Sequence, residues 1–198
     1  LIQYSIEVAR KLASDEDICV STDDEEIIRV TESLGLKVPF VRPAEYATDT
    51  ATSNDVILHA LRFYEERGVL YDIVVLLQPT SPLRTVEHVK EAMSLYTSDI
   101  DMVVSVKHSS AAYVMCKENK VGFLEPVVNS GIVRRQDMPE FYEYNGAVYV
   151  INVKALIEKG MSGFNKERKY VMDEKFSWDI DTLLDWSIVE NLLVNADK

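Results

Sequence analysis

Two acidic residues near the end of the chain have the spacing of a metal-binding pair. Asp179 and Asp181 flank Ile180. In an extended segment, residues two apart point to the same side, so both carboxylates can face one point while Ile180 turns toward the core. Mg²⁺ in proteins binds one or two carboxylates and completes its octahedron with water and substrate phosphate. The pair is therefore suited to Mg²⁺, and the alternative is that Asp181 caps a helix beginning at Thr182.

Three arginines have the chemistry to hold an anion. Arg42 opens a polar loop that runs to Ser53, at the start of a predicted helix. Such a loop and helix N-terminus can bind a polar or anionic ligand, to which a guanidinium adds a rigid fork of donors. Arg134 and Arg135 are adjacent in an otherwise acidic chain and could capture a carboxylate or phosphate. Capping by Ser53 and ordinary solvation of the arginine pair are the alternatives.

A short apolar run that ends in a polar turn is the centre of the predicted fold. Residues 73–77 are apolar, too few for a helix, and predict a strand buried on both faces of a parallel sheet. Gln78, Thr80 and Ser81 follow among two prolines, which would hold their polar groups rigidly outward. Open α/β sheets bind ligands at the carboxyl ends of strands. The alternative is two tight turns in which Thr80 and Ser81 serve only as caps.

Helical and strand patterns alternate along most of the chain. This alternation predicts a three-layer, Rossmann-like α/β sheet in a single domain, residues 1–198. A run of acids at residues 23–26 and the pattern of Thr52 with Asp55 predict helix caps. Helices are expected from residues 1, 26, 53, 85, 154 and 182, and strands at 18–21, 38–41, 73–77, 102–106 and 147–151.

The alternation breaks down between residues 107 and 144. Short apolar runs at 113–116 and 122–124 predict a hairpin that stands off the sheet as a small mixed extension. The pair Asn145-Gly146 predicts a left-handed turn that leads back into the sheet. Residues 160–170 are expected to form a basic loop.

Several stretches resemble motifs of the acylneuraminate cytidylyltransferase family, the CMP-sialic acid synthetases and their relatives. They occur in the family's order and span nearly the whole chain. The matching stretches are Ser21–Glu26, Arg42–Ser53, Leu77–Arg84 with the sequence LQPTSPLR, Arg134–Asp137, Tyr144–Ile151 and Asp179–Thr182.

The resemblance implies a reaction and a role for each candidate residue. The reaction is transfer of a cytidylyl group from CTP to a nine-carbon 2-keto sugar acid, giving a CMP-sugar and pyrophosphate. By the resemblance, Arg42 and Ser53 bind the nucleotide, and Asp179 and Asp181 hold catalytic Mg²⁺. The residues implied to bind the sugar acid, or pyrophosphate in the case of the arginines, are Gln78, Thr80, Ser81, Arg134, Arg135, Tyr144 and Asn145.

Two other functions stay open at this point. One is a nucleotidyltransferase acting on another sugar, such as a keto-deoxyoctulosonate or a sugar 1-phosphate. The other is a non-catalytic, sugar-binding dimerisation domain. In the resembled family a strand and a glycine-rich loop that holds the phosphates precede a helix like the one expected from Leu1, and this sequence has no glycine cluster to which that role could be given. No motif encodes which sialic, legionaminic or pseudaminic acid is used.

Composition limits the partners. A formal net charge of −12 argues against a nucleic-acid-coating surface, and no apolar run approaches the roughly 20 residues that cross a bilayer. Two cysteines form no disulfide framework, which favours a cytoplasmic protein. In the resembled family an extension like that at 107–144 builds a dimer and lends residues to the neighbouring site, so a homodimer is expected.

Overall fold

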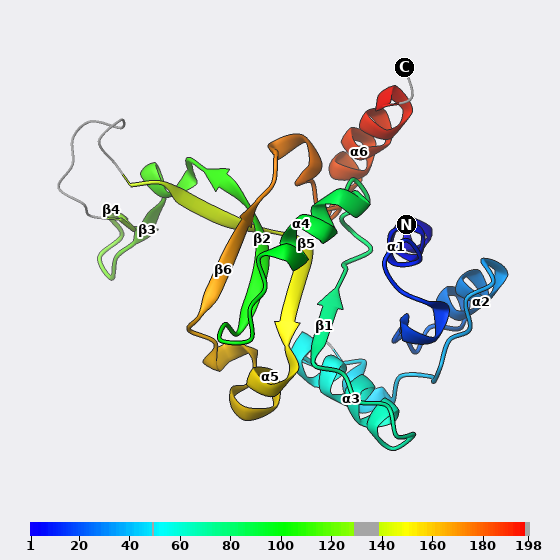
Figure 1. Ribbon diagram of the computed structural model, residues 1–198. Helices are drawn as coiled ribbons and strands as arrows, with labels where there is room; N and C mark the ends of the chain where they lie inside the picture. Colours follow the sequence, from blue (N-terminus) through cyan, green and yellow to red (C-terminus); the bar gives the residue numbers. More distant parts are fainter. Residues whose placement is uncertain (49, 129–138, 197–198) are drawn as a thin grey trace.

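The computed structural model describes residues 1–48, 50–128 and 139–196. Its centre is a four-stranded sheet with the order β1-β5-β2-β6 (Figure 1). β5 pairs antiparallel with both β1 and β2, whereas β2 and β6 are parallel. The strands are β1 (Ile73–Leu76), β2 (Met102–Ser109), β5 (Phe141–Asn152) and β6 (Glu167–Val171).

Helices cover both faces of this sheet, which confirms the expected three layers. On one face, Val8 of α1 and Val89 of α4 pack with Val103 and Val148. On the other face, α3 and α5 pack on the alternate strand residues, including Met102 and Val104. The helices are α1 (Ile2–Ala9), α2 (Glu25–Ser33), α3 (Ser53–Glu65), α4 (Val86–Ser94), α5 (Val153–Lys159) and α6 (Leu183–Ala196). No helix in the described part of the chain is long and apolar enough to span a membrane.

The caps predicted for two helices are present. The carboxylate of Asp24 accepts hydrogen bonds from the backbone N–H groups of Glu26 and Ile27 and so caps α2. Thr52 and Asp55 form a reciprocal capping box at the start of α3. These caps satisfy backbone donors that no helical carbonyl can reach, which explains why the helices begin where they do.

Strand β1 differs from the strand expected at its position. It lies at the edge of the four-stranded sheet, pairs there only with the antiparallel strand β5, and all four of its residues are half-buried. The two N-terminal segments expected to be strands meet in a single parallel bridge between Thr22 and Val41. The predicted parallel pairing was therefore wrong, because β5 enters between β1 and β2 in the opposite direction. Both faces of β1 do pack against the core, although its residues are only half-buried.

Two further segments depart from the sequence expectation. Gly146 has a φ of +72° as predicted, but it lies inside β5, where the register with β2 shifts between Val104 and Val106. It therefore produces a bulge rather than a turn. The segment expected to be a basic loop contains β6, whose charged residues line a sheet edge and gave no strand-like apolar pattern.

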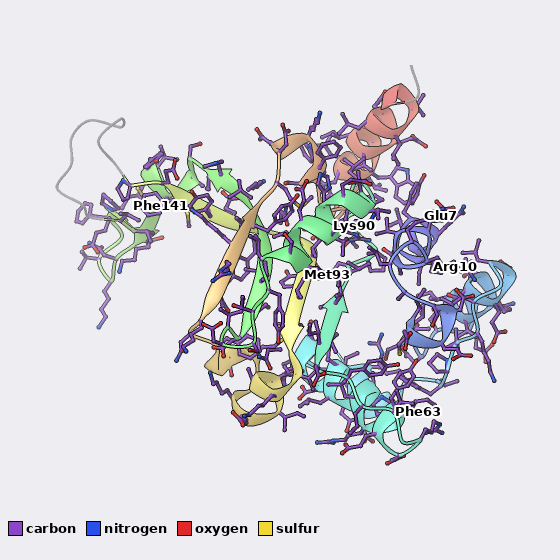
Figure 2. The ribbon with its side chains drawn as sticks, viewed as in Figure 1. Glu7, Arg10, Phe63, Lys90, Met93 and Phe141 are labelled. Carbon is purple, nitrogen blue, oxygen red and sulfur yellow. The ribbon has the colours of Figure 1, made fainter. Side chains whose placement is uncertain are left out.

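A small hairpin stands away from the sheet, as expected for the extension (Figure 1). Its strands are β3 (Cys116–Glu118) and β4 (Leu124–Pro126), two or three residues later than predicted. Figure 2 shows Phe141, where β5 begins, beside this hairpin, and its ring lies 5.5 Å from that of Tyr113. β5 thus links the extension directly to the sheet.

Candidate functional site

A cavity of about 410 Å³ lies where β1 and β2 end and β5 passes between them. Five residues predicted to bind sugar or metal line it: Gln78, Tyr144, Asn145, Asp179 and Asp181. They come from the loop after β1, from β5 and from the segment before α6, which are far apart in the sequence. The fold therefore gathers three of the matching motifs around one cavity.

The loop after β1 anchors the segment that carries the two aspartates. The carbonyl of Thr80 accepts a hydrogen bond from the N–H of Ile180 at 2.9 Å, and the hydroxyl of Ser81 donates to Oδ1 of Asp179 at 3.2 Å. Ser81 is fully buried, so its hydroxyl faces the protein and not solvent. In the structure, Thr80 and Ser81 hold the wall of the cavity, and only Gln78 of the three polar residues in this loop lines it.

Gly146 brings the same walls close together. A Cβ atom at this position would lie 2.6 Å from Oε1 of Gln78 and 3.2 Å from Oδ2 of Asp179. Its positive φ also disfavours other residues. A glycine is therefore required here for β5 to pass beside the Gln78 amide and the Asp179 carboxylate.

The start of α6 does not depend on the carboxylate of Asp181. The hydroxyl of Thr182 accepts a hydrogen bond from the N–H of Asp185 at 3.2 Å. The carboxylate of Asp185 in turn accepts from the N–H groups of Thr182, at 2.8 Å, and of Asp181, at 3.3 Å. This reciprocal arrangement supplies the cap, which leaves the Asp181 carboxylate free to meet a ligand.

The cavity carries more negative than positive side chains. Glu143 and Asp185 line it together with the two aspartates, and Lys107 is the single basic lining residue in the described ranges. Nζ of Lys107 lies 3.5 Å from Oε2 of Glu143. The pKa of Glu143 is lowered by the Ser109 hydroxyl and then by Lys107. The positive charge of Lys107 is therefore shared with Glu143, and the aspartates are left without a cationic partner among the described side chains.

This donor set fits Mg²⁺. Asp179 and Asp181 offer hard carboxylate oxygens at an open cavity, with space for water and phosphate in the remaining positions. Among the described residues, no group of three or more His, Cys, Asp and Glu side chains could hold a metal ion. A cation at the pair would therefore complete its coordination from water and substrate, as Mg²⁺ usually does.

A buried arginine lies behind the cavity wall. Arg84 is 3% exposed, and Nη1 donates to the carbonyls of Gln78, at 3.1 Å, and Ala147, at 2.9 Å. Nη2 donates to the hydroxyl of Ser5 at 2.7 Å, whereas Nε has no partner among the described atoms. Burial lowers the pKa of the guanidinium to about 10. Arg84 thus joins the loop after β1 to β5 and α1.

The structure places the two predicted nucleotide-binding residues outside this cavity. The Arg42 side chain is half-buried and donates to the carbonyls of Ser21 and, at 3.5 Å, Tyr46. Ser53 lines a separate hollow of about 230 Å³ beside residues 160–162. Arg134 and Arg135 lie outside the described residues.

Several lining residues were not predicted from the sequence. Lys107 and Glu143 lie near the ends of paired strands, and Trp178 directly precedes Asp179. Burial, followed by the charge of Asp179, raises the pKa of Tyr149, which lines the same cavity. The one available signal was position: Lys107 is the first charged residue after the apolar run of β2.

Comparison with known structures identifies the class of fold. The chain superposes on CMP:2-keto-3-deoxy-manno-octonic acid synthetase, solved in complex with CTP, with a TM-score of 0.69. The match covers 98% of this chain and 88% of that one, at 16% sequence identity. The sheet and its covering helices therefore have the same Rossmann-like fold as that synthetase.

Comparison of sequences identifies the family within this class. The model of the family described as cytidylyltransferase matches residues 1–191. The chain belongs to this cytidylyltransferase family, and its resemblance to the acylneuraminate enzymes is confirmed.

The relatives act on related sugar acids, according to their names. CMP-N,N'-diacetyllegionaminic acid synthase of Legionella pneumophila is 30% identical over 197 residues, which are 98% of this chain and 84% of the relative. Pseudaminic acid cytidylyltransferase of Campylobacter jejuni is 28% identical and covers 93% of this chain and 81% of its own. N-acylneuraminate cytidylyltransferase of Escherichia coli is 31% identical over 95% of this chain, which spans 44% of that longer protein.

Proposed function

We propose that this protein transfers a cytidylyl group from CTP to a nonulosonic acid, giving a CMP-sugar and pyrophosphate. The observation that carries the proposal is the match of nearly the whole chain, at 30% identity, to a CMP-diacetyllegionaminic acid synthase. The cavity supports it, because it joins hydrogen-bonding groups suited to a sugar with a carboxylate pair suited to Mg²⁺.

The proposed reaction requires no covalent intermediate on the protein. The anomeric hydroxyl of the sugar acid attacks the α-phosphorus of CTP, a new P–O bond forms, and the bond to the pyrophosphate leaving group breaks. The Gln78 amide and the exposed Tyr144 side chain would hydrogen-bond the sugar at the cavity wall. The Tyr144 hydroxyl donates its one proton to Glu167, and burial followed by this contact raises its pKa to about 12, so toward the sugar it would act as a hydrogen-bond acceptor.

Asp179 and Asp181 would hold Mg²⁺ in this reaction. When bound, the ion would offset negative charge on the phosphoryl oxygens and the leaving group. The chain's own contribution is to fix the two carboxylates. Ser81 donates to Asp179, and Thr182 with Asp185 caps α6 so that Asp181 does not have to.

The nucleotide and the acidic group of the sugar would be held by arginines. Arg42 and Ser53 are proposed to bind the cytidine part, and Arg134 or Arg135 to pair with the sugar carboxylate or pyrophosphate.

The extension is proposed to form a homodimer. Large apolar side chains are exposed on and beside the hairpin, among them Val114, Val121, Phe123 and Leu124. Such a cluster on a small element standing off the sheet is typical of an interaction surface. Sedimentation at micromolar concentration should therefore give a dimer, and Phe123→Asp should shift it toward the monomer. A monomer that binds the sugar acid normally would contradict this proposal.

A cytoplasmic location is proposed because the reaction consumes CTP and because Cys19 and Cys116 are free thiols.

A pyrophosphate-release assay tests the proposed function. The full-length protein is supplied with CTP, UTP or ATP and with sialic, legionaminic, pseudaminic or keto-deoxyoctulosonic acid, or with a sugar 1-phosphate. We expect release only with CTP and a nonulosonic acid, and dependence on Mg²⁺. Release with keto-deoxyoctulosonic acid or a sugar 1-phosphate instead would identify a different sugar nucleotidyltransferase. Calorimetric uptake of the sugar acid without any turnover would identify a binding domain.

A further inference from the structure

The side chain of Asn145, at the wall of the cavity, is engaged entirely within the protein. Its Oδ1 accepts hydrogen bonds from the Ser105 hydroxyl at 2.6 Å and from the N–H of Ala147 at 3.2 Å. Its Nδ2 donates to the Ser177 hydroxyl at 2.9 Å and contacts Sδ of Met172 at 3.3 Å. Because an amide side chain has two donors and one acceptor oxygen with two lone pairs, no strong hydrogen-bonding position is left for a substrate.

The two serines extend this contact into a directed chain of hydrogen bonds. The N–H of Val148 donates to Ser105, Ser105 donates to Asn145, Asn145 donates to Ser177, and Ser177 donates to the carbonyl of Asp173. The distances are 2.7, 2.6, 2.9 and 2.9 Å. All three side chains are buried, Ser105 completely. In such a chain each bond polarises the next, and an unpaired member would be costly.

Through Ser177, this series of hydrogen bonds reaches the segment that carries the aspartates. Ser177 is two residues before Asp179, with Trp178 between them at the cavity wall. The segment is then held from the other side by Ser81, through Asp179, and by the carbonyl of Thr80, through Ile180. Ser177 is therefore the residue through which β2 and β5 hold the backbone that leads to the carboxylate pair.

We propose that Asn145, Ser105 and Ser177 are positioning residues: they fix the Trp178–Asp181 segment so that its two carboxylates face one cation. The inference rests on the proposed function, and it assigns Asn145 a role through the metal-binding pair instead of a direct contact with the sugar. Side chains that orient metal ligands in this way are typically worth about 10- to 100-fold in metal affinity.

Ligand-free fluorescence gives a test that does not depend on turnover. Trp178 and Trp186 are the two tryptophans of the chain, and Trp186 is 45% exposed, so Trp186→Phe leaves Trp178 as a single reporter. In that background Ser177→Ala should shift the Trp178 emission to longer wavelength, because the segment loses its anchor. The matched control is Thr31→Val, which removes another buried hydroxyl, bonded to the Ile27 carbonyl at 2.8 Å in α2, and should leave the emission unchanged.

Binding of Mn²⁺ alone, followed by electron paramagnetic resonance, gives the second measurement. Asn145→Ala, Ser105→Ala and Ser177→Ala should each weaken Mn²⁺ binding about 10- to 100-fold, with Asp181→Asn as the reference for a lost ligand. The Asn145→Ala/Ser177→Ala double variant should be no weaker than the poorer single variant, since both act through one chain. Circular dichroism melts establish folding, and Ser177→Ala, the mildest change, keeps the test valid if Asn145→Ala unfolds.

Kinetics separate the positioning role from the alternative that Asn145 contacts the sugar directly. The positioning role predicts that all three variants raise the Mg²⁺ concentration needed for half-maximal turnover and leave the KM for the sugar acid near that of the unaltered protein. The proposal is overturned if Ser177→Ala matches the Thr31→Val control in emission and Mn²⁺ binding while Asn145→Ala alone raises the KM for the sugar. Failure of the proposed function would appear differently, as absent turnover with the emission shift and Mn²⁺ effect intact.

Discussion

The two ends of β2 differ in whether their charged side chains have partners within the protein. At the start of the strand, Asp101 is buried and its carboxylate accepts from Nζ of Lys159 at 2.7 Å and from the N–H groups of Asn165 and Lys166, each at 3.0 Å. The hydrogen bond from Lys159, followed by that from Asn165, lowers the pKa of Asp101 to about 2. The buried carboxylate at this end thus has its partners within the fold.

At the other end of β2, at and behind the cavity, two charged side chains lack an oppositely charged partner among the described residues. Arg84 is buried with no carboxylate partner among the described residues, and Asp179 has one hydrogen bond, at 3.2 Å, from Ser81. A buried or unpaired charge is costly, so a protein keeps one where something else completes it. The contrast indicates that the cavity end is arranged for a ligand, whereas the Asp101 end is arranged for stability.

The largest effect on turnover should come from changes to Asp179 and Asp181, the two aspartates of the cavity. Asp179→Asn and Asp181→Asn should each lower kcat at least about 100-fold, because an amide is a poor ligand for a hard cation. The melting temperature should stay nearly unchanged, since the α6 cap is supplied by Thr182 and Asp185. Steady-state kinetics across a Mg²⁺ titration, with melting curves alongside, check both parts.

Asp23→Asn, a change at an exposed carboxylate before α2, is the matched control and should leave turnover unaltered. Normal Mg²⁺-dependent turnover in Asp181→Asn would show that the residue is no metal ligand. It would also remove the difference between the two ends of β2, because a carboxylate without a cationic partner would then not indicate a ligand site.

Arg84 should contribute strongly to stability, because its guanidinium holds together three segments behind the cavity wall. Arg84→Leu leaves the carbonyls of Gln78 and Ala147 without their buried donor, and we expect a loss of about 3 kcal/mol in the free energy of unfolding. Arg84→Lys keeps the charge but not the fork and should lose less. Urea denaturation measures both, and equal stability of Arg84→Leu and the unaltered protein would mean that the unpaired guanidinium has no structural role.

Periodicity and capping signals predicted the layers of the fold but not the order of its strands. The capping box at Thr52, the helix starts and the buried strand β2 depend on residues close in sequence, so a local pattern is sufficient. The antiparallel entry of β5 and the edge position of β1 depend on pairing between residues that are more than seventy positions apart. β6 was missed because Glu167–Val171 has charged residues on an edge strand, where alternation is weak.

The candidate site shows the same division. The motif residues Gln78, Tyr144, Asn145, Asp179 and Asp181 could be selected from the sequence, and they do meet at one cavity. The direction in which each side chain points could not be predicted from the sequence, since it is set by tertiary contacts. Ser81 turns inward to Asp179, and the Asn145 amide is engaged by Ser105 and Ser177.

A change at Asp101, at the start of β2, should lower the free energy of unfolding moderately, by an amount that depends strongly on pH in the acid range. Asp101→Asn should cost about 1 to 3 kcal/mol near neutral pH, because Lys159 loses its partner while the two N–H groups keep an acceptor. The pKa of Asp101 is lowered from an ordinary value of 3.8 to about 2, so its contribution is present above pH 4 and is lost as the pH falls toward 2. Unfolding measured between pH 2 and 6 should therefore converge for the variant and the unaltered protein, and turnover at neutral pH should be unaffected. A fall in turnover without a loss of stability would place Asp101 with the cavity residues instead.

The smallest effect on the free energy of unfolding should come from His88, at the start of α4. It should appear at higher pH than the effect of Asp101. Nδ1 of His88 accepts the N–H of Thr85 at 3.1 Å, which only the unprotonated nitrogen can do, and the ring packs 4.7 Å from that of Phe176. Burial lowers the pKa of His88 below its ordinary value of 6.5, so the unfolded chain takes up the proton first. Stability from this cap is therefore complete above about pH 6.5 and declines as the pH falls below it, by less than about 1 kcal/mol. His88→Gln can keep the capping box without titrating, and the difference in unfolding free energy between it and the unaltered protein should change between pH 7 and 5. A difference independent of pH over this interval would mean that protonation of His88 does not weaken the cap of α4.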